Sequence, residues 1–303
     1  MKSVRPFIRA TEMSLDIEIK SEQFAAGWAG DFWHECMNRT SCTPIHRPKD
    51  TRAPLDVKAF VQSMVDVRTS VVEHWEKTLS TTAVDPRHDA VFGFALYVLS
   101  CALEMSSASN RYAISGRLFL RCLTECRITL AYLVSADDPN LWARFRSYGA
   151  GQAKLALLKA EAMSGSTPGF VEKATLEALA NEDFFQEFVE IDLGHWCGKD
   201  LRKMAEDSGT KDEYDKFYGW ASSFIHGQWG AIRDSNLTHC SNPLHRFHRI
   251  PLWSHRPMGD ALGDAISLVN STLETVEKAY PGKLLRLNIS QPGTEEQPKE
   301  SAS

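Results

Sequence analysis

Four polar residues recur at intervals of four near the C-terminal third of the chain: Tyr214, Tyr218, Ser222 and His226. Residues four apart lie on one face of an α-helix, so this row would project toward a single cleft. A histidine in such a row could act as a general acid or base. The alternative is a face at the edge of the core, whose polar tips bond to neighbouring helices.

Three charged residues, Arg117, Arg121 and Glu125, have the same spacing inside a strongly apolar segment. A charge buried there must be paired, because an uncompensated buried charge is costly. We therefore predict that Arg121 and Glu125 share one network with Tyr218 and His226. The network is either structural or catalytic. In the catalytic case His226 would act as a general acid or base.

A third group of candidates lies in the segment 244–256, where basic and aromatic residues alternate. Arginines hold phosphates and aromatic faces stack on bases, so this is the best local candidate for a contact with single-stranded nucleic acid. The alternative is a surface loop whose aromatic side chains anchor it to the core. The residues predicted to bind nucleic acid are Arg246, Arg249, Trp253 and Arg256.

Two sets of residues have the chemistry of metal ligands. The first set is His34, Cys36, Cys42 and His46, and the second is His239, Cys240, His245 and His248. Zinc prefers such ligands, but neither set has the paired short spacings of an established zinc finger. The sequence therefore predicts no metal cofactor. The alternative is a zinc ion bound by one of the two sets. Gly-rich phosphate loops, Gly-x-Ser-x-Gly elbows and His-Glu-x-x-His motifs are absent from the sequence.

The elements that must position these residues are mostly helices. Apolar periodicity and N-terminal Asp or Pro signals predict helices over about 54–79, 86–105, 112–134, 137–163, 170–180, 182–191, 197–208, 211–228 and 258–280. The stretch 90–103 is apolar but too short to span a bilayer, so it is expected to be a buried core helix and no membrane partner is expected. Residues 235–258 have no clear period and are predicted to form a loop.

Two short segments alternate apolar and polar residues, as half-buried strands do. Leu15–Ile19 and Leu285–Ile289 carry complementary charges, and we predict that they pair. The expected fold class is all-α: a multi-helix bundle with a small two-stranded β-ribbon formed by the terminal segments. The expected parts are an N-terminal arm and loop (1–54), a main helical domain (55–282), and a short strand with a disordered tail (283–303).

Composition narrows the function classes. The formal net charge of −5 argues against broad, non-specific nucleic-acid binding but leaves room for a local basic patch. Seven cysteines, an odd number, follow an N-terminus without a signal-like apolar run, so a cytoplasmic protein without a disulfide framework is expected. Cys101, Cys122 and Cys126 lie in apolar helical patterns and are interpreted as small core residues.

Three stretches together resemble a bacterial family of helical proteins catalogued as domain of unknown function family 5677. They are the Arg-x-x-x-Glu helix (121–133), a helix with Arg144, Tyr148 and Lys154, and the Tyr-x-x-x-Tyr-x-x-x-Ser-x-x-x-His pattern (214–226). The resemblance covers about 85–245. It implies an all-helical fold and a distant similarity to HEPN domains, helical bundles that bind nucleotides or cleave RNA and that often serve toxin and anti-phage systems.

The HEPN signature is an arginine followed, after four to six residues, by a histidine. Arg233 and His239 fit it, but chance alone predicts such matches in this sequence, and no arginine stands at that spacing before His226. Arg121 would then have to supply the cation from another helix. Two hypotheses follow. The protein is a HEPN-like, metal-independent ribonuclease or nucleotide-acting effector, or it is a non-enzymatic module that senses or binds a protein partner or a second copy of itself.

Overall fold

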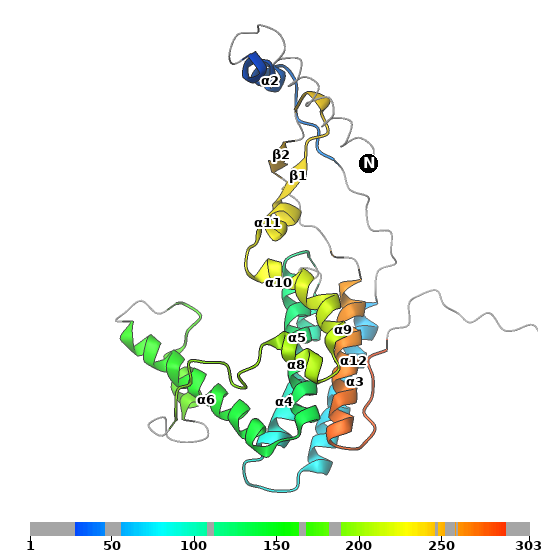
Figure 1. Cartoon of the computed structure of the whole chain (residues 1–303). Helices are drawn as coiled ribbons and strands as arrows, with labels where there is room; N and C mark the ends of the chain where they lie inside the picture. The colour runs from blue at the N-terminus through cyan, green and yellow to red at the C-terminus, as the bar shows by residue number, and fades with distance from the viewer. Residues whose placement is uncertain are drawn as a thin grey trace, which may run out of the picture. The chain divides into compact units, whose positions relative to one another are not determined.

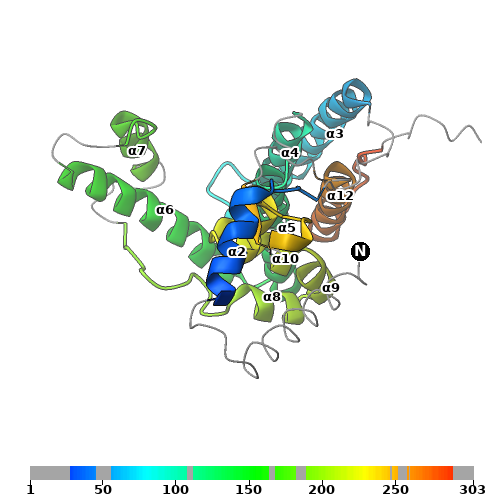
Figure 2. The same cartoon turned by 90° about the horizontal axis from the view of Figure 1, so that it is seen from above.

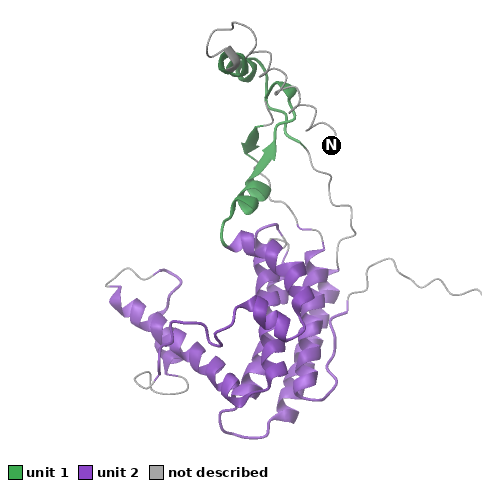
Figure 3. Ribbon diagram, in the orientation of Figure 1, with its two compact units in different colours: residues 1–51, 226–257 green, residues 52–225, 258–303 purple. Residues whose placement is uncertain are grey.

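The computed structural model describes residues 28–45, 56–107, 112–163, 168–181, 189–245, 248–251, 258 and 260–288 (Figure 1). The chain divides into two compact units (Figure 3). Unit 1 combines residues 1–51 with 226–257, and unit 2 combines residues 52–225 with 258–303. Each unit is therefore built from two separate stretches of the chain.

Four long helices form the body of unit 2: α3 (Val57–Thr78), α4 (Pro86–Ser106), α5 (Ser115–Ala136) and α12 (Ala261–Ala279). They lie side by side in both views (Figures 1 and 2). Aspartates begin α3 and α4, because the side chains of Asp56 and Asp85 accept hydrogen bonds from backbone N–H groups of the first turn. The apolar positions of α3 recur at helical spacing and are buried at Phe60, Met64, Val67 and Val71.

Helix α4 is the most apolar of the four. By length and composition alone it could cross a membrane, and half of its apolar window is buried inside the protein. Its buried side chains pack against α3, α5 and α12. The structure thus uses α4 as a core helix.

The remaining helices of unit 2 are shorter or attach to one end of the body. Helix α6 (Pro139–Ala162) begins near the buried Trp142, and α7 (Lys173–Ala180) packs on α6. Helices α8 (Leu201–Asp207), α9 (Lys211–Glu213) and α10 (Gly219–Ile225) follow, with the π-helical turn η3 (Tyr214–Tyr218) between the last two. Of the predicted helix 182–191, residues 182–188 lie outside the described part and 189–191 are not helical.

Unit 1 contains α2 (Trp28–Arg39), α11 (Trp229–Asn236), β1 (Leu237–His239), the 3-10 turn η4 (Pro243–His245) and β2 (Arg249–Pro251). The two strands pair antiparallel, with Thr238 opposite Ile250. The segment after α2 lies along this hairpin. Ile45 N donates to His239 O at 3.1 Å, and Ser241 N donates to Thr43 O at 2.7 Å.

The predicted fold class is confirmed, an all-helical bundle with one small two-stranded ribbon. The ribbon of the described residues lies at 237–239 and 249–251, inside the stretch predicted to be a loop. Leu15–Ile19 lies outside the described residues, and 283–288 form no strand. Instead the Asn270 side chain of α12 exchanges two hydrogen bonds of 2.9 Å with the backbone of Leu287. An extended segment can satisfy its backbone in this way without a partner strand.

Two further differences concern the N-terminal part of the chain. Helix α2 occupies residues that were expected to form an arm and loop. The predicted helical domain 55–282 also contained residues 226–257, which the structure groups with residues 1–51. The physical reason is the set of backbone hydrogen bonds that joins residues 43–45 to the hairpin.

Candidate metal centre and buried polar network

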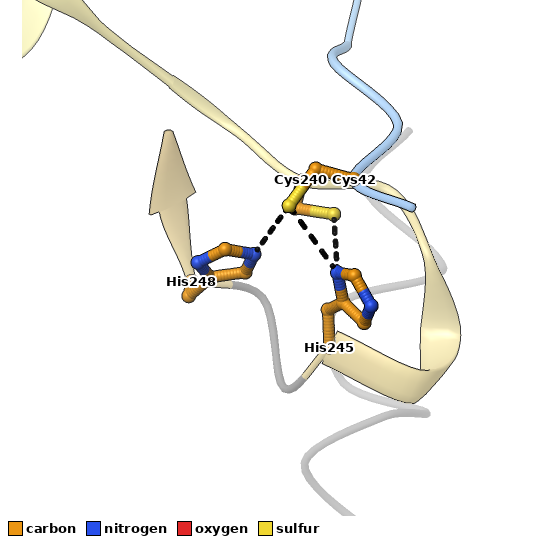
Figure 4. A group of neighbouring side chains, drawn as sticks. All are labelled: Cys42, Cys240, His245 and His248. Atoms are coloured by element: carbon orange, nitrogen blue, oxygen red, sulfur yellow. Dashed lines mark hydrogen bonds between the residues drawn. The ribbon is translucent and has the colours of Figure 1, made fainter. Parts of the chain in front are cut away.

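Cys42, Cys240, His245 and His248 gather in unit 1, with one ligand atom from each within 4.8 Å of all the others (Figure 4). Cys42 Sγ lies 3.2 Å from His248 Nε2 and 3.5 Å from His245 Nδ1. Cys240 Sγ lies 3.4 Å from His245 Nδ1. Two sulfurs and two imidazole nitrogens therefore converge on one point and could hold a metal ion.

The hairpin and the segment after α2 position these four side chains. Cys240 directly follows β1, His245 ends η4, and His248 directly precedes β2. The turn between the strands is closed by Cys240 N, which donates to His248 O at 2.9 Å. Cys42 reaches the group because Pro44 forms an antiparallel bridge with Cys240. Backbone pairing thus brings a ligand from the N-terminal segment to three ligands of one hairpin.

Neighbouring groups orient the cluster. Thr40 Oγ1 lies 2.8 Å from His245 Nε2, which leaves Nδ1 of the same ring facing the sulfurs. The backbone N–H of Thr43 donates to Cys240 Sγ at 3.3 Å. A hydrogen bond to the second nitrogen of a ligating histidine, and donors around the ligand atoms, are usual features of metal sites.

Burial differs across the cluster. Cys240 and His245 are buried, whereas Cys42 is exposed. Partial desolvation and the neighbouring Cys240 raise the pKa of the Cys42 thiol above its usual value. Two thiols so close together do not readily both ionise without a cation between them.

The structure takes one ligand from the first predicted set and three from the second. His34, Cys36 and His239 lie outside the group, and His46 lies outside the described residues. All four ligands belong to the sets predicted from the sequence, but the sequence did not link Cys42 to the other three, and Cys42 and His248 are 206 residues apart in the chain. That link depends on the hairpin, which the sequence pattern did not reveal.

The second candidate site surrounds Arg121 on α5 of unit 2. Arg121 is buried, and its Nη2 atom lies 2.7 Å from Glu125 Oε1 and donates to Tyr218 Oη at 2.8 Å. The guanidinium carbon is 3.5 Å from the Tyr218 ring, a cation–π contact. Nε and Nη1 have no hydrogen-bond partner among the described residues. Burial of these nitrogens without hydrogen bonds is unfavourable, and the cation–π contact with the Tyr218 ring offsets part of that free-energy cost.

The two tyrosines of the predicted row are stacked. The rings of Tyr214 and Tyr218 are 4.5 Å apart at 17°, and both belong to the π-helical turn. Isolated π-helical turns are rare and often occur at functional sites. Burial raises the pKa of Tyr218 above its usual value, against the lowering effect of Arg121. Tyr218 therefore remains a neutral hydroxyl group at physiological pH.

Three of the four residues of the predicted network, Arg121, Glu125 and Tyr218, come together. His226 does not continue the row, because α10 ends at Ile225 and Gly227 has a φ of +56°. Glycine with positive φ just past a helix is a common helix terminator. His226 is an exposed residue of the following turn, counted in unit 1, and its membership of the network stays a prediction.

A second buried arginine on α5 was not among the candidates. Arg127 donates from Nη1 to Thr275 Oγ1 at 2.7 Å, and its Nη2 lies 3.4 Å from Glu213 Oε1. Burial lowers the pKa of Arg127, and Glu213 and Glu274 oppose this effect. The signal in the sequence was its position one and a half turns after Arg121, within the same apolar segment.

The candidate nucleic-acid residues are only partly described. The guanidinium of Arg249, on β2, lies 5.7 Å from the ring of Trp229, whose side chain is 59% exposed. Arg246, Trp253 and Arg256 lie outside the described residues. Trp229 was not among the predicted residues, although it provides an exposed aromatic face beside one of them.

These observations define a helical protein with a separate hairpin module that carries a Cys/His cluster. Residues 88–243, just over half of the chain, match the Family of unknown function (DUF5677), and the chain belongs to that family. No curated protein and no solved structure matches the chain. The matched stretch includes Arg121, Glu125 and Tyr218, but of the Cys/His cluster it includes only Cys240.

Proposed function

We propose that unit 1 binds a structural zinc ion through Cys42, Cys240, His245 and His248, and that the zinc-bound unit contacts RNA. The observation that supports the ion is the convergence of four ligand atoms within 4.8 Å of one another. Two thiolates and two imidazoles are a ligand set that zinc takes in tetrahedral structural sites. Because four protein ligands leave no open position, the ion would stabilise the unit rather than activate a water molecule.

The packing of unit 1 supports this role. Within the part of unit 1 that the structure describes, the buried apolar side chains are those of Ala231 and Cys240. So small a core does not stabilise a fold in water, and small units commonly depend on disulfides or metals instead. Binding of zinc by ligands from both stretches of the unit would supply the missing free energy of folding.

Metal analysis of the purified protein tests the zinc site. Wild-type chain purified in the presence of zinc should contain one zinc ion per chain by inductively coupled plasma mass spectrometry. Cys240→Ser and His245→Ala should each lose it. Cys36→Ser and His239→Ala are matched controls, because both residues belong to the sets predicted from the sequence but lie outside the cluster. They should retain the metal.

Two outcomes would overturn the zinc site. One is a wild-type chain that stays free of zinc after equilibration with excess zinc and reductant. The other is a mass spectrum that shows Cys42 and Cys240 joined as a disulfide in protein prepared under reducing conditions. Equal loss of zinc in the Cys36→Ser control would place the ion elsewhere.

The RNA contact is supported by the pairing of Arg249 with the exposed ring of Trp229. An exposed aromatic face next to an arginine can stack on a base and hold a phosphate. Fluorescence anisotropy with a labelled single-stranded RNA should show weaker binding for Arg249→Ala and Trp229→Ala. Arg39→Ala, an exposed arginine of the same unit, is the control and should bind normally. If neither variant changes binding, a protein partner becomes the better proposal for this surface.

A second candidate function is ribonuclease activity at the Arg121 network, as the HEPN-like hypothesis expects. Three features favour it: buried guanidinium nitrogens of Arg121 that have no hydrogen-bond partner within the described part of the chain, a half-exposed carboxylate on Glu125, and the π-helical turn. The exposed position of His226 favours a structural role for the network instead. Such an activity would suit a toxin or anti-phage effector.

Incubation with total RNA distinguishes the two roles. Cleavage by the wild-type chain that disappears in His226→Ala and Tyr218→Phe would support the enzyme. His34→Ala, another exposed histidine of unit 1, is the control for His226. Unchanged RNA in every sample would leave the network with a structural role in a non-enzymatic recognition protein.

A further inference from the structure

Three cysteines of unit 2 lie at the contact between α4 and α5, and two of them directly follow Arg121 and Glu125 in the sequence. Cys101 Sγ on α4 lies 3.9 Å from Cys122 Sγ on α5. Cys122 Sγ also lies 3.6 Å from the hydroxyl of Tyr97, one turn before Cys101. Cys126 follows one turn after Cys122. Packing of α4 against α5 does not by itself require three cysteines close to a tyrosine hydroxyl.

The three thiols differ in access to solvent. Cys101 and Cys126 are each 8% exposed, whereas Cys122 is intermediate. Tyr97, whose hydroxyl contacts Cys122, is 53% exposed, so this edge of the contact between the two helices borders on solvent. A small oxidant can therefore reach Cys122 before it reaches either buried neighbour.

Electrostatics also single out Cys122. Hydrogen bonding with Cys101 and Cys126, then with Tyr97, and the charge of Arg121 lower the pKa of the Cys122 thiol below its usual value. Hydrogen bonding to Cys122 and burial raise the pKa of Cys101 and of Cys126. Cys122 is thus both the most exposed of the three thiols and the one whose neighbours favour the thiolate, which is the nucleophilic form.

The distances between the residues decide which cysteine can form a disulfide with Cys122. Residues four apart on a helix have Cβ atoms about 5–6 Å apart, which exceeds the roughly 3.5–4.5 Å of a disulfide. Cys126 is therefore badly placed to bond with Cys122 on the same helix. Cys101 approaches from the other helix, and its sulfur is 3.9 Å from that of Cys122, against about 2.0 Å in a disulfide.

We propose that Cys122 is a site of oxidation by hydroperoxides and that Cys101 resolves it as a disulfide that links α4 to α5. The Cys122 thiolate attacks the terminal peroxide oxygen, the O–O bond breaks, and the alkoxide leaves with a proton as alcohol or water. The resulting sulfenic acid is attacked by the Cys101 sulfur, which forms the S–S bond and releases water. In sum, two thiols are oxidised and one hydroperoxide is reduced to an alcohol or water, plus one water molecule.

Peptide mapping of the full-length, reduced protein after treatment with hydrogen peroxide tests this site. Trypsin leaves Cys101 in the peptide 88–111 and Cys122 with Cys126 in the peptide 122–127. Wild-type protein should yield the two peptides linked, lighter by two hydrogen atoms than their sum. Cys126→Ser should yield the same linked pair. Cys122→Ser should lose it, and Cys101→Ser should instead accumulate a sulfenic acid at Cys122 that a dimedone probe captures.

The expected result also includes a higher melting temperature for oxidised wild-type protein and for oxidised Cys126→Ser, because the bond joins two core helices. An undiminished linked pair in Cys122→Ser, through Cys126, would overturn the proposal. So would a wild-type protein in which peroxide oxidises Cys42 or Cys240 while the peptides 88–111 and 122–127 stay unlinked. Thermal unfolding of each reduced variant shows whether the substitution has disturbed the fold.

Discussion

Unit 2 and unit 1 bury different kinds of side chain. Unit 2 buries long apolar side chains from α3, α4, α5 and α12 in one continuous core. In the described part of unit 1 the most buried side chains include Cys240 and His245, which belong to the Cys/His cluster. Burial of apolar surface stabilises unit 2, whereas under the zinc proposal unit 1 depends on an ion held by the Cys/His cluster. The two units should therefore respond to different perturbations.

Metal removal should separate the two units most strongly. Structural zinc contributes on the order of 10–16 kcal/mol of apparent free energy in small zinc-dependent folds. Treatment with a chelator should therefore abolish amide protection in residues 237–251 in hydrogen-exchange mass spectrometry. The helices of unit 2 should keep their protection and their melting temperature. Loss of protection in both units at once would show that they do not unfold independently.

A cavity in unit 2 should have the reverse effect. Leu273 on α12 is fully buried, and Leu273→Ala should lower the free energy of unfolding of unit 2 by about 3–5 kcal/mol. The zinc content and the protection of residues 237–251 should not change. Leu285→Ala, at a leucine that is 52% exposed, is the control and should cost less than about 0.5 kcal/mol. Chemical denaturation monitored by circular dichroism gives both values.

The Arg121 network should show a smaller effect. Removal of one partner from a buried ion pair costs about 3–5 kcal/mol, and exposed pairs contribute less than about 1 kcal/mol. The Glu125 side chain is 43% exposed, so Glu125→Ala should cost about 1–2 kcal/mol. A double-mutant cycle with Tyr218→Phe should give a coupling of about 0.5 kcal/mol or more, because both groups bond to Arg121.

A double-mutant cycle between Glu125 and His226 should give the opposite result to the cycle between Glu125 and Tyr218. Because His226 is exposed and lies beyond the end of α10, His226→Ala and Glu125→Ala should have additive effects on stability. A coupling as large as that between Glu125 and Tyr218 would return His226 to the network, as the four-residue spacing predicted.

The smallest expected effect is a pH dependence at the end of unit 2. The hydrogen bond from Arg286, and then that from the backbone N–H of Leu284, hold the pKa of Glu277 below its ordinary value of 4.5. Glu277 thus contributes stability that is present above about pH 4.5 and is lost as the pH falls through its lower folded pKa. Thermal unfolding should show a weaker dependence on pH in Glu277→Gln as the pH is lowered below 4.5. An identical dependence in both proteins would contradict this role of the pair.

The sequence predicted unit 2 far better than unit 1, for a physical reason. Long helices with periodic apolar faces carry their own signal, so the bounds of α3, α4, α5 and α12 were found to within a few residues. The Arg121–Glu125 pair was predictable because it follows from spacing within one helix. The hairpin strands are three residues long and are stabilised by contacts with residues 43–45, which no local pattern reveals.

The errors in the polar row have the same origin. A four-residue repeat implies a continuous helix, but the chain adopts a π-helical turn at Tyr214–Tyr218 and stops at Ile225. Gly227 was the available signal for that stop. Each of the two predicted metal sets was local in sequence. The cluster combines residues from both sets, because an antiparallel β-bridge pairs Pro44 with Cys240.

The position of the ligands along the chain also has a temporal consequence. Cys42 and His248 are 206 residues apart, and ribosomes add about 5–20 residues per second, so about 10–40 s separate their synthesis. For most of that interval Cys42 has none of its three partners, because Cys240, the first of them to be made, comes near its end. A chain released before residue 248 therefore cannot assemble the four-ligand cluster, however well its central helices have formed.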